Sequence, residues 1–309
     1  MRRLDQLIAE VRAQTKNEEY GTNRGIQQNE MVRYMRDAQA RIENLIKQQH
    51  PNVVVREAFI DSISGQEEYT IPTDAYASSN IIRVEYSITG NVRDYYPLDL
   101  RSLAQRCTVP GDPEFYIPRS SKILINPIPY NSVSSGIRLN YQYRLPSLDI
   151  RRGTVSGSVI NIVTRKVTSI TFANDSNLDN TGLADADYVC VVDRYGNFLM
   201  RDLICSSYNS GTRTLSIDAA FTYAIGETLP NGSYVTIGKY TTTHSQLDDI
   251  CERYLNAYTA WKVLKRDSNV DSSDQQVELQ AMEQEIVDCY AQLDEDIDTI
   301  PMISNDWLG

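Results

Sequence analysis

The sequence contains few of the residues from which catalytic and metal sites are usually built. Its 309 residues include only two histidines, His50 and His244, and five cysteines, no two of which form a Cys-x-x-Cys pair. A structural zinc site needs four Cys or His ligands at close spacing, so none is expected here. Widely spaced cysteines in an odd number instead predict reduced, mostly structural thiols.

The motifs of common nucleotide-binding and hydrolytic enzymes are also missing. The sequence has no GxxxxGKS/T phosphate-binding loop, no GxGxxG turn and no GxSxG nucleophile turn. The acids at Asp185–Asp187 and Asp294–Asp298 do not follow the spacing of a calcium-binding loop, so we interpret them as solvated surface. The sequence therefore predicts a protein that is not an enzyme and that needs no cofactor and no metal.

Long apolar runs are absent as well. No stretch approaches the ~20 apolar residues that a membrane-spanning helix needs. The first residues, MRRLDQLIAEVRAQ, place apolar side chains at helical spacing and contain no signal-peptide core or cleavage site. We therefore expect no membrane contact, and synthesis in the cytoplasm.

Basic residues are scarce in one part of the chain only. The net charge is −11, and residues 244–309 account for it, with fifteen Asp or Glu against four Lys or Arg. No basic residue follows Arg266, whereas twelve acids do. Such a segment disfavours tight phosphate binding, because that binding depends on Lys and Arg. It is a solvated face, a surface that docks on a basic partner, or the lining of a passage through which DNA slides without sticking.

Hydrophobic periodicity predicts helices near both ends of the chain. Apolar residues recur at steps of three and four over 3–15, 30–49, 246–266 and 275–296. Asn29 and Ser245 stand where the N-caps of the second and third of these helices are expected. The spacing predicts that the helices pack together as a bundle.

The chain between these helices is typical of strands and turns. Segments over 53–145 alternate apolar and polar residues and end at Pro, Gly or Asp. Residues 150–240 have a turn signal about every 8–12 residues, which predicts a separate all-β module. The expected fold class is therefore α+β: a helical bundle from the N- and C-terminal helices packed with an antiparallel β-sheet, plus an inserted all-β barrel or sandwich.

The same patterns predict a domain division. Residues 1–149 and 241–309 are expected to form the core, with the helices and the sheet together. Residues 150–240 are expected to be an inserted β-domain, because the chain enters and leaves it close to the same strands. Residues 297–309 are expected to be a C-terminal docking tail.

Five short motifs follow one another through the strand-rich segment. They are YTIPTD at Tyr69–Asp74, RVEY at Arg83–Tyr86, YPL at Tyr96–Leu98, GDPEFYI at Gly111–Ile117 and KILINPIP at Lys122–Pro129. In this order, and flanked by helices, they resemble the head-to-tail adaptor proteins (connector or head-completion proteins) of tailed bacteriophages, especially short-tailed ones. The resemblance covers residues 27–145 and 245–309 and leaves out 146–243.

This resemblance implies a structural ring subunit of a virion. Adaptor proteins assemble as about twelve copies beneath the portal ring, extend the DNA channel, and seat the tail nozzle and the tailspikes or fibres. The implied partners are the portal protein, the nozzle protein, tailspike or fibre proteins, further copies of the chain, and genomic DNA that passes without sequence-specific binding. The implied location is the neck and tail of the virion, after synthesis in the cytoplasm of the bacterial host.

The C-terminal tail and the second helix contain the candidate assembly residues. Apolar residues on an aperiodic, acidic tail are costly to leave in water, so we expect them to dock on the portal or on a neighbouring copy. These residues are Ile300, Met302, Ile303, Trp307 and Leu308. The candidates for electrostatic pairing between copies are Arg33, Arg36 and Arg41 on one side and Asp294, Glu295 and Asp296 on the other.

Two alternative functions remain open at this point. A peripheral tail or fibre-attachment component would bind a receptor or glycan through residues 150–240, whose Asp, Asn and Tyr content suits sugars. A peptidoglycan hydrolase, which is less favoured, would need two carboxyl groups about 5–10 Å apart. We interpret the adjacent acids Glu67-Glu68 as a strand edge and Asp248-Asp249 as a helix start, where the helix macrodipole favours negative charge.

Overall fold

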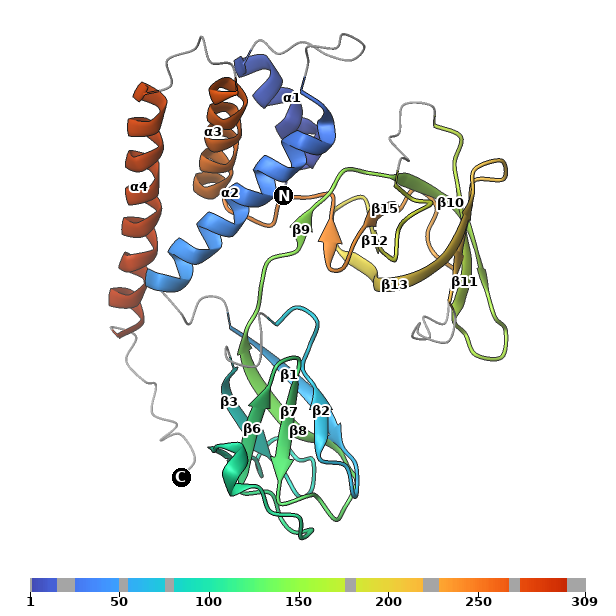
Figure 1. Cartoon of the computed structure of the whole chain (residues 1–309), viewed down its shortest axis with the longest axis vertical. Helices are drawn as coiled ribbons and strands as arrows, with labels where there is room; N and C mark the ends of the chain where they lie inside the picture. The colour runs from blue at the N-terminus through green and yellow to red at the C-terminus, as the bar shows by residue number, and fades with distance from the viewer. Residues whose placement is uncertain are drawn as a thin grey trace, which may run out of the picture. The chain divides into compact units, whose positions relative to one another are not determined.

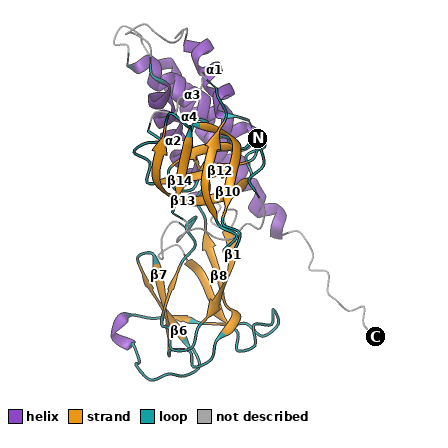
Figure 2. Ribbon diagram, turned by 90° about the vertical axis from the view of Figure 1, so that its right-hand side faces the viewer, coloured by secondary structure: helices purple, strands orange, loops and turns teal. Residues whose placement is uncertain are grey.

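The computed structural model describes residues 2–15, 26–49, 55–75, 81–175, 182–218, 228–266 and 273–298, with side chains as far as residue 291. The chain divides into two compact units (Figure 1; Figure 2). One combines Met1–Leu45 with Pro146–Gln292, and we name it the helix–barrel unit. The other combines Ile46–Leu145 with Leu293–Gly309, and we name it the sheet unit.

The helices lie where the sequence predicts them. They are α1 Leu4–Thr15, α2 Gln28–Gln49, α3 Asp249–Lys265 and α4 Ser273–Asp298. Helix α3 lies between α1 and α4 in Figure 1 and buries side chains such as Tyr254 and Leu255 completely. Among the described side chains of α4, only Leu279 and Ile286 are buried. Most of the described part of α4 therefore faces solvent.

The two predicted N-caps are wrong. Asn29 lies inside α2, where its side-chain oxygen accepts a hydrogen bond from Arg152 (2.8 Å). Helix α3 is capped by Asp248 rather than Ser245, because the Asp248 carboxylate accepts a hydrogen bond from the backbone N–H of Cys251 (3.0 Å). A serine hydroxyl and a carboxylate can both cap a helix. Only the carboxylate also carries the negative charge that the helix macrodipole favours at this end.

The predicted all-β module is a closed barrel. Its strands are β10 Gly153–Ile160, β11 Val167–Phe172, β12 Tyr188–Val192, β13 Phe198–Asn209, β14 Thr214–Ile217 and β15 Tyr234–Ile237. They pair in the order β10-β11-β14-β13-β12-β15, and β15 returns to β10. Closure leaves no unpaired sheet edge, and the interior is filled by apolar side chains such as Ile170, Val191 and Leu215.

A short parallel strand pair joins the barrel to the helices. Strand β9 Ser147–Leu148 leads into the barrel, and strand β16 Thr241–Thr242 leads out of it. Just after β16, the carbonyl of Thr243 accepts a hydrogen bond from the backbone N–H of Leu4, the first residue of α1 (2.9 Å). The start of α1 is therefore fixed to the exit of the barrel.

The sheet unit contains two four-stranded sheets, where the sequence predicts one. The first has the order β1-β8-β3-β4 and the second has the order β2-β7-β6-β5. The strands of the first are β1 Val55–Ser62, β8 Val133–Gln142, β3 Ile81–Tyr86 and β4 Tyr96–Pro97. Those of the second are β2 Glu68–Thr70, β7 Lys122–Asn126, β6 Phe115–Arg119 and β5 Asp99–Leu100.

One apolar cluster holds these two sheets together. Val84 and Leu139 from the first sheet and Tyr69 and Ile123 from the second belong to it, and all four side chains are buried. The strand-rich motifs of the sequence therefore build a sandwich. The α+β fold class, with a helical bundle, antiparallel sheets and a barrel, is confirmed.

The compact units group these elements differently from the expected domains. The sequence pattern places the helices with the strands of 53–145, whereas the compact unit that holds most of the helices also contains the barrel. The definition of 150–240 as an inserted domain stays a prediction. None of the helices among the described residues is both long enough and apolar enough to span a membrane.

Candidate assembly surfaces

The predicted docking tail lies outside the described residues. This applies to Ile300, Met302, Ile303, Trp307 and Leu308. The backbones of Asp294, Glu295 and Asp296 belong to the last turns of α4, and their side chains are outside the description. The role of all eight residues stays a prediction.

The three basic candidates on α2 have different surroundings. Arg36 donates from Nε to the carbonyl of Leu148 (2.6 Å) and lies 3.3 Å from the Asp149 carboxylate. Arg41 donates from Nη2 to Glu283 on α4 (2.9 Å). Arg33 is exposed, its guanidinium lies over the Tyr34 ring, and no ion pair found among the described residues includes it. Two of the three arginines therefore stabilise their own chain.

The Asp149 carboxylate is the centre of a buried junction between α2 and the barrel. It is 1% exposed and lies just after β9. Its Oδ1 accepts from Arg36 (3.3 Å) and Arg152 (3.0 Å), and its Oδ2 accepts from the backbone N–H of Ile237 on β15 (2.8 Å). Arg152 is itself buried and also reaches Asn29 on α2. We name these side chains, Asp149, Arg152, Arg36 and Asn29, the Asp149 junction.

Sequence reasoning missed this junction, although its residues carry a signal. LDIRRG at 148–153 places one acid and two arginines next to a strand, which is an unusual density of charge at a domain entry. Buried charges are retained only when they are paired and hydrogen-bonded. The pairing partner, however, is on α2, more than one hundred residues earlier in the chain.

A second network joins α2, α3 and α4. The Tyr254 hydroxyl on α3 donates to Glu283 on α4 (2.5 Å), and Arg41 on α2 binds the same carboxylate. Burial, followed by the hydrogen bond to Glu283, raises the pKa of Tyr254 above its ordinary range, so the hydroxyl stays protonated. Glu283 thus connects all three helices.

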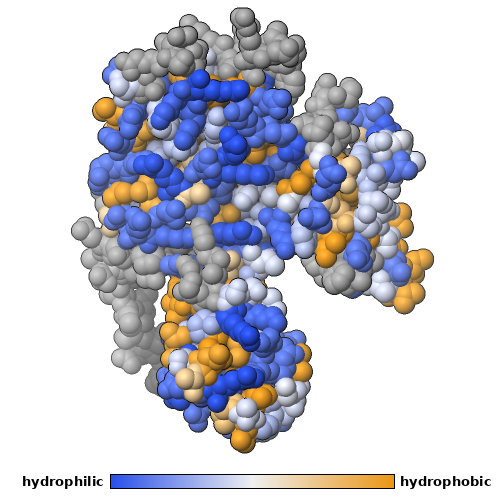
Figure 3. Space-filling model, viewed as in Figure 1, coloured by the Kyte–Doolittle hydropathy of each residue, from blue (hydrophilic) through white to orange (hydrophobic). Residues whose placement is uncertain are grey.

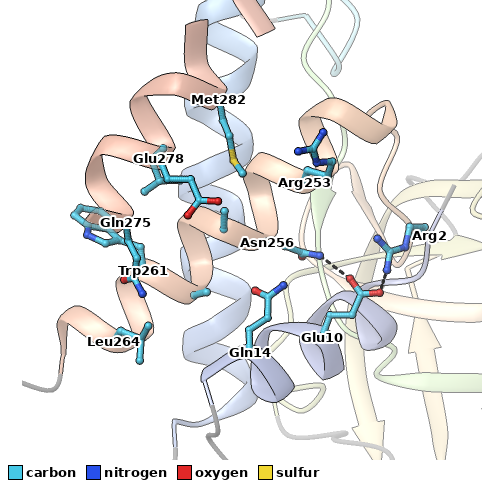
Figure 4. Close-up of a pocket in the computed structure, with 13 residues that line it drawn as sticks. Arg2, Glu10, Gln14, Arg253, Asn256, Trp261, Leu264, Gln275, Glu278 and Met282 are labelled. Atoms are coloured by element: carbon cyan, nitrogen blue, oxygen red, sulfur yellow. Dashed lines mark hydrogen bonds and ion pairs between the residues drawn. The ribbon is translucent and has the colours of Figure 1, made fainter. Parts of the chain in front are cut away.

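A groove of about 380 Å³ lies between α1, α3 and α4 (Figure 4). On one side, Glu10 of α1 binds Arg2 and accepts a hydrogen bond from the amide of Asn256 on α3 (2.8 Å). On the other side, Glu278 of α4 is exposed. The apolar side chains that line the groove are Ala257, Ala260, Trp261, Leu264, Leu279 and Met282.

Several buried polar atoms of this groove have no partner within the described chain. They are Asn256 Oδ1, Trp261 Nε1 and Gln275 Oε1, and Asn256 is only 5% exposed. A buried polar atom without a hydrogen bond costs about 1–3 kcal/mol. The groove therefore has apolar walls and unused hydrogen-bonding atoms, which is typical of a surface that a partner completes.

Exposed apolar residues gather in two places (Figure 3). In the helix–barrel unit, Val159, Ile162 and Val163 of the β10–β11 hairpin are 57%, 86% and 89% exposed. In the sheet unit, the exposed apolar residues include Ile88, Val92 and Val109 in loops and Leu103 in a short 3-10 helix. The sequence analysis did not single out this hairpin, although the two adjacent β-branched residues Ile162 and Val163 at a turn are an unusual pattern.

The remaining candidates for chemistry have structural roles. Glu67 is paired with Arg106, Glu68 binds Lys122 (2.7 Å), and Asp248 caps α3. All five cysteines are unpaired, and burial raises the pKa of thiols such as Cys205, there to about 12. Within the part of the chain that the structure describes, no three His, Cys, Asp or Glu side chains lie close enough to hold a metal ion. His50 lies outside that part.

His244 contributes to the connection between α1 and the barrel. It is 3% exposed, its Nδ1 is hydrogen-bonded to the Thr243 hydroxyl (2.9 Å), and its ring stacks on Tyr234. Gly196 has φ +92°, and a Cβ there would lie 2.6 Å from the His244 Cβ, so only glycine allows this approach. Burial, and to a smaller extent the charge of Arg3, lowers the pKa of His244, which keeps the ring neutral.

Comparison with known proteins places the chain in a family. The family described as SU10 adaptor protein matches residues 2–160, from before α1 to the end of β10, just over half of the chain. No curated protein matches the sequence. The match includes all strands of the sheet unit, where the five motifs lie. The chain therefore belongs to the SU10 adaptor protein family: it is a structural head-to-tail adaptor of a bacteriophage, a component of the virion that contacts other head and tail proteins.

Proposed function

We propose that this adaptor is a ring subunit that joins the portal of a short-tailed phage to its tail and extends the DNA channel. The observation that carries the proposal is the family match, which covers the helices α1 and α2 and all strands of the sheet unit. The chain acts through surfaces, without catalysis. Its proposed partners are the portal protein, the nozzle protein, tailspike or fibre proteins and further copies of itself, about twelve in a closed ring.

The acidity of α4 supports a role beside DNA. Asp274, Glu278, Glu285 and Asp288 are all exposed, and no basic residue follows Arg266 in the sequence. DNA is attracted to a protein surface chiefly by Lys and Arg, which displace counterions from its phosphates. An acidic surface along a channel lets DNA pass during packaging and ejection without being held.

The test of this proposal is imaging of the virion and of the purified assembly by electron microscopy. A closed ring on the particle axis, between portal and tail, is the expected result. A peripheral trimer at the outside of the tail would contradict the proposal and would favour a receptor-binding or fibre-attachment component.

The C-terminal tail is proposed to dock on the portal or on a neighbouring copy. Deletion of residues 297–309 should leave the barrel and the bundle folded, because the described core contacts lie before residue 292. It should weaken assembly on the portal, measured by co-sedimentation of the two purified proteins. Unchanged co-sedimentation would show that the apolar residues of the tail have no docking role.

A further inference from the structure

The turn between β10 and β11 is held rigidly by one asparagine. The side-chain oxygen of Asn161 accepts hydrogen bonds from the backbone N–H groups of Val163 (2.9 Å) and Thr164 (3.0 Å). Its backbone carbonyl accepts from Arg165 (2.7 Å), and its N–H donates to the carbonyl of Lys166 (2.9 Å). The conformation of the tip is therefore fixed before any partner arrives, which lowers the entropy cost of binding.

This rigid turn displays two apolar side chains. Ile162 is 86% exposed and Val163 is 89% exposed, with Val159 nearby at 57%. A hairpin turn ordinarily uses Gly, Asn or Asp, whose backbones suit it. β-branched apolar residues do nothing for such a turn, and burying them against a partner would remove their apolar surface from water. We name Asn161–Lys166 the hairpin tip.

The groove between α1, α3 and α4 has the complementary properties. Its volume of about 380 Å³ is within the range of pockets that bind ligands, about 300–1,000 Å³. Its apolar walls suit aliphatic side chains, and its unpartnered Trp261 Nε1 and Asn256 Oδ1 suit the carbonyl and N–H groups of a backbone. Of the charged residues that line it, Arg2 is paired with Glu10 and Arg253 lies 3.9 Å from Glu285. Glu278 is exposed and belongs to no ion pair found among the described residues, whereas the hairpin tip carries Arg165 and Lys166.

We propose that the hairpin tip of one copy inserts into the groove of the neighbouring copy, with Ile162 and Val163 against the apolar walls and Arg165 beside Glu278. This inference rests on the proposed ring, since it needs a second copy. The tip and the groove are different patches of the helix–barrel unit, so the contact is head-to-tail. Each copy then offers one tip and one groove, and such contacts give a closed ring when the rotation from copy to copy closes.

Cross-linking tests the contact directly. Purified full-length Val163→Cys and Ala257→Cys variants are mixed, assembled and oxidised, and disulfide-linked peptides are identified by mass spectrometry. A disulfide between the two variants is the expected result, and it forms only between different copies. The controls are the wild-type chain mixed with each variant, which account for the native cysteines.

Substitutions test whether the contact drives assembly. Val163→Asp should weaken ring formation about tenfold or more, measured by analytical ultracentrifugation, because it puts a charge into an apolar contact. The control is Val92→Asp, another exposed valine (68%, against 89% for Val163) in the sheet unit, which should assemble like the wild type. Arg165→Glu should also weaken assembly, and adding Glu278→Arg should restore it.

The outcomes separate this inference from the proposed function. Suppose that the wild-type chain forms rings, that Val163→Asp assembles as well as Val92→Asp, and that no cross-link forms. The proposed tip–groove contact is then wrong, whereas the proposed ring is supported. If Glu278→Arg fails to rescue Arg165→Glu although the cross-link forms, the proposed ion pair is wrong. If the wild-type chain forms no ring, either alone or on the portal, both the proposed function and the tip–groove contact are contradicted.

Discussion

The Asp149 junction and the groove between α1, α3 and α4 both contain buried polar atoms, but only those of the junction have partners in the described chain. In the junction, each oxygen of the buried Asp149 carboxylate accepts hydrogen bonds, from Arg36, Arg152 and the backbone of β15. In the groove, Asn256, Trp261 and Gln275 each keep a buried polar atom that has no partner among the described residues. Both sites belong to the helix–barrel unit.

This difference distinguishes a surface that the chain completes by itself from one that it leaves open. A buried polar group must find a partner, because leaving it without one costs more than the bond gains. The junction finds its partners between helix and barrel and so fixes one to the other. The groove lacks them in the single chain, which is consistent with a partner that supplies them. Substitutions at groups with partners should therefore cost more stability than substitutions at groups that lie on the surface or have no partner in the described chain.

The largest effect is expected from Asp149→Ala. The substitution leaves the Arg152 guanidinium, whose side chain is 9% exposed, without its principal carboxylate. Removing one partner of a buried ion pair costs about 3–5 kcal/mol, so the unfolding free energy should fall by that amount. Urea denaturation followed by circular dichroism measures it.

A control for this effect is Glu285→Gln on α4. Glu285 lies 3.9 Å from Arg253, and both side chains are more than half exposed (51% and 63%). Such surface pairs contribute less than about 1 kcal/mol. If Asp149→Ala were as mild as Glu285→Gln, the junction would not hold helix and barrel together.

A smaller, paired effect is expected on α3, where Tyr254→Phe removes a hydroxyl group and Trp261→Phe removes the indole N–H together with part of the ring. The Tyr254 hydroxyl donates to the Glu283 carboxylate, whereas Trp261 Nε1 donates to nothing in the described chain. Tyr254→Phe should therefore lower the unfolding free energy by about 1.5–3 kcal/mol. Trp261→Phe loses no hydrogen bond of the described chain and shortens a ring that is only partly buried, so it should cost less. Equal losses in urea denaturation would contradict the distinction between the completed and the open surface.

The smallest effect is expected from pH, through His244. Because the pKa of the folded His244 is lowered, the unfolded chain takes up a proton first as the pH falls below about 6.5. The stability contributed by the neutral ring is thus present above that pH and is lost as the pH falls toward the folded pKa. The melting temperature should decline between pH 7 and 5, and His244→Asn should flatten this decline. His50→Asn, at the other histidine of the sequence, should retain it.

Sequence reasoning predicted the elements well and their connections less well. Helix α2 was predicted almost to the residue, because its pattern of apolar residues reflects one buried face. The caps at Asn29 and Ser245 were wrong, because several polar residues compete locally and the winner depends on what lies nearby. The second sheet was missed, because alternation indicates strands and not which strands pair.

The candidate assembly residues show the same limit. Arg33, Arg36 and Arg41 share one basic helix in the sequence, but in the fold two of them bind Asp149 and Glu283 of the same chain. Their charge alone does not reveal this, since the partners are more than one hundred residues away. The acidity of the C-terminal segment, by contrast, is fully visible in the sequence, because net charge does not depend on the fold.

The sequence by itself determined the local structure, the acidic end, the absence of common catalytic motifs and the five strand motifs that lead to the adaptor family. These properties depend on the order and type of neighbouring residues. Only the tertiary structure decided which buried charges are satisfied, that the β-module closes as a barrel, and that a groove and a rigid apolar hairpin tip are left without partners in the described chain. Hydrogen-bond pairing and burial are relations between residues far apart in sequence, and the fold alone brings those residues together.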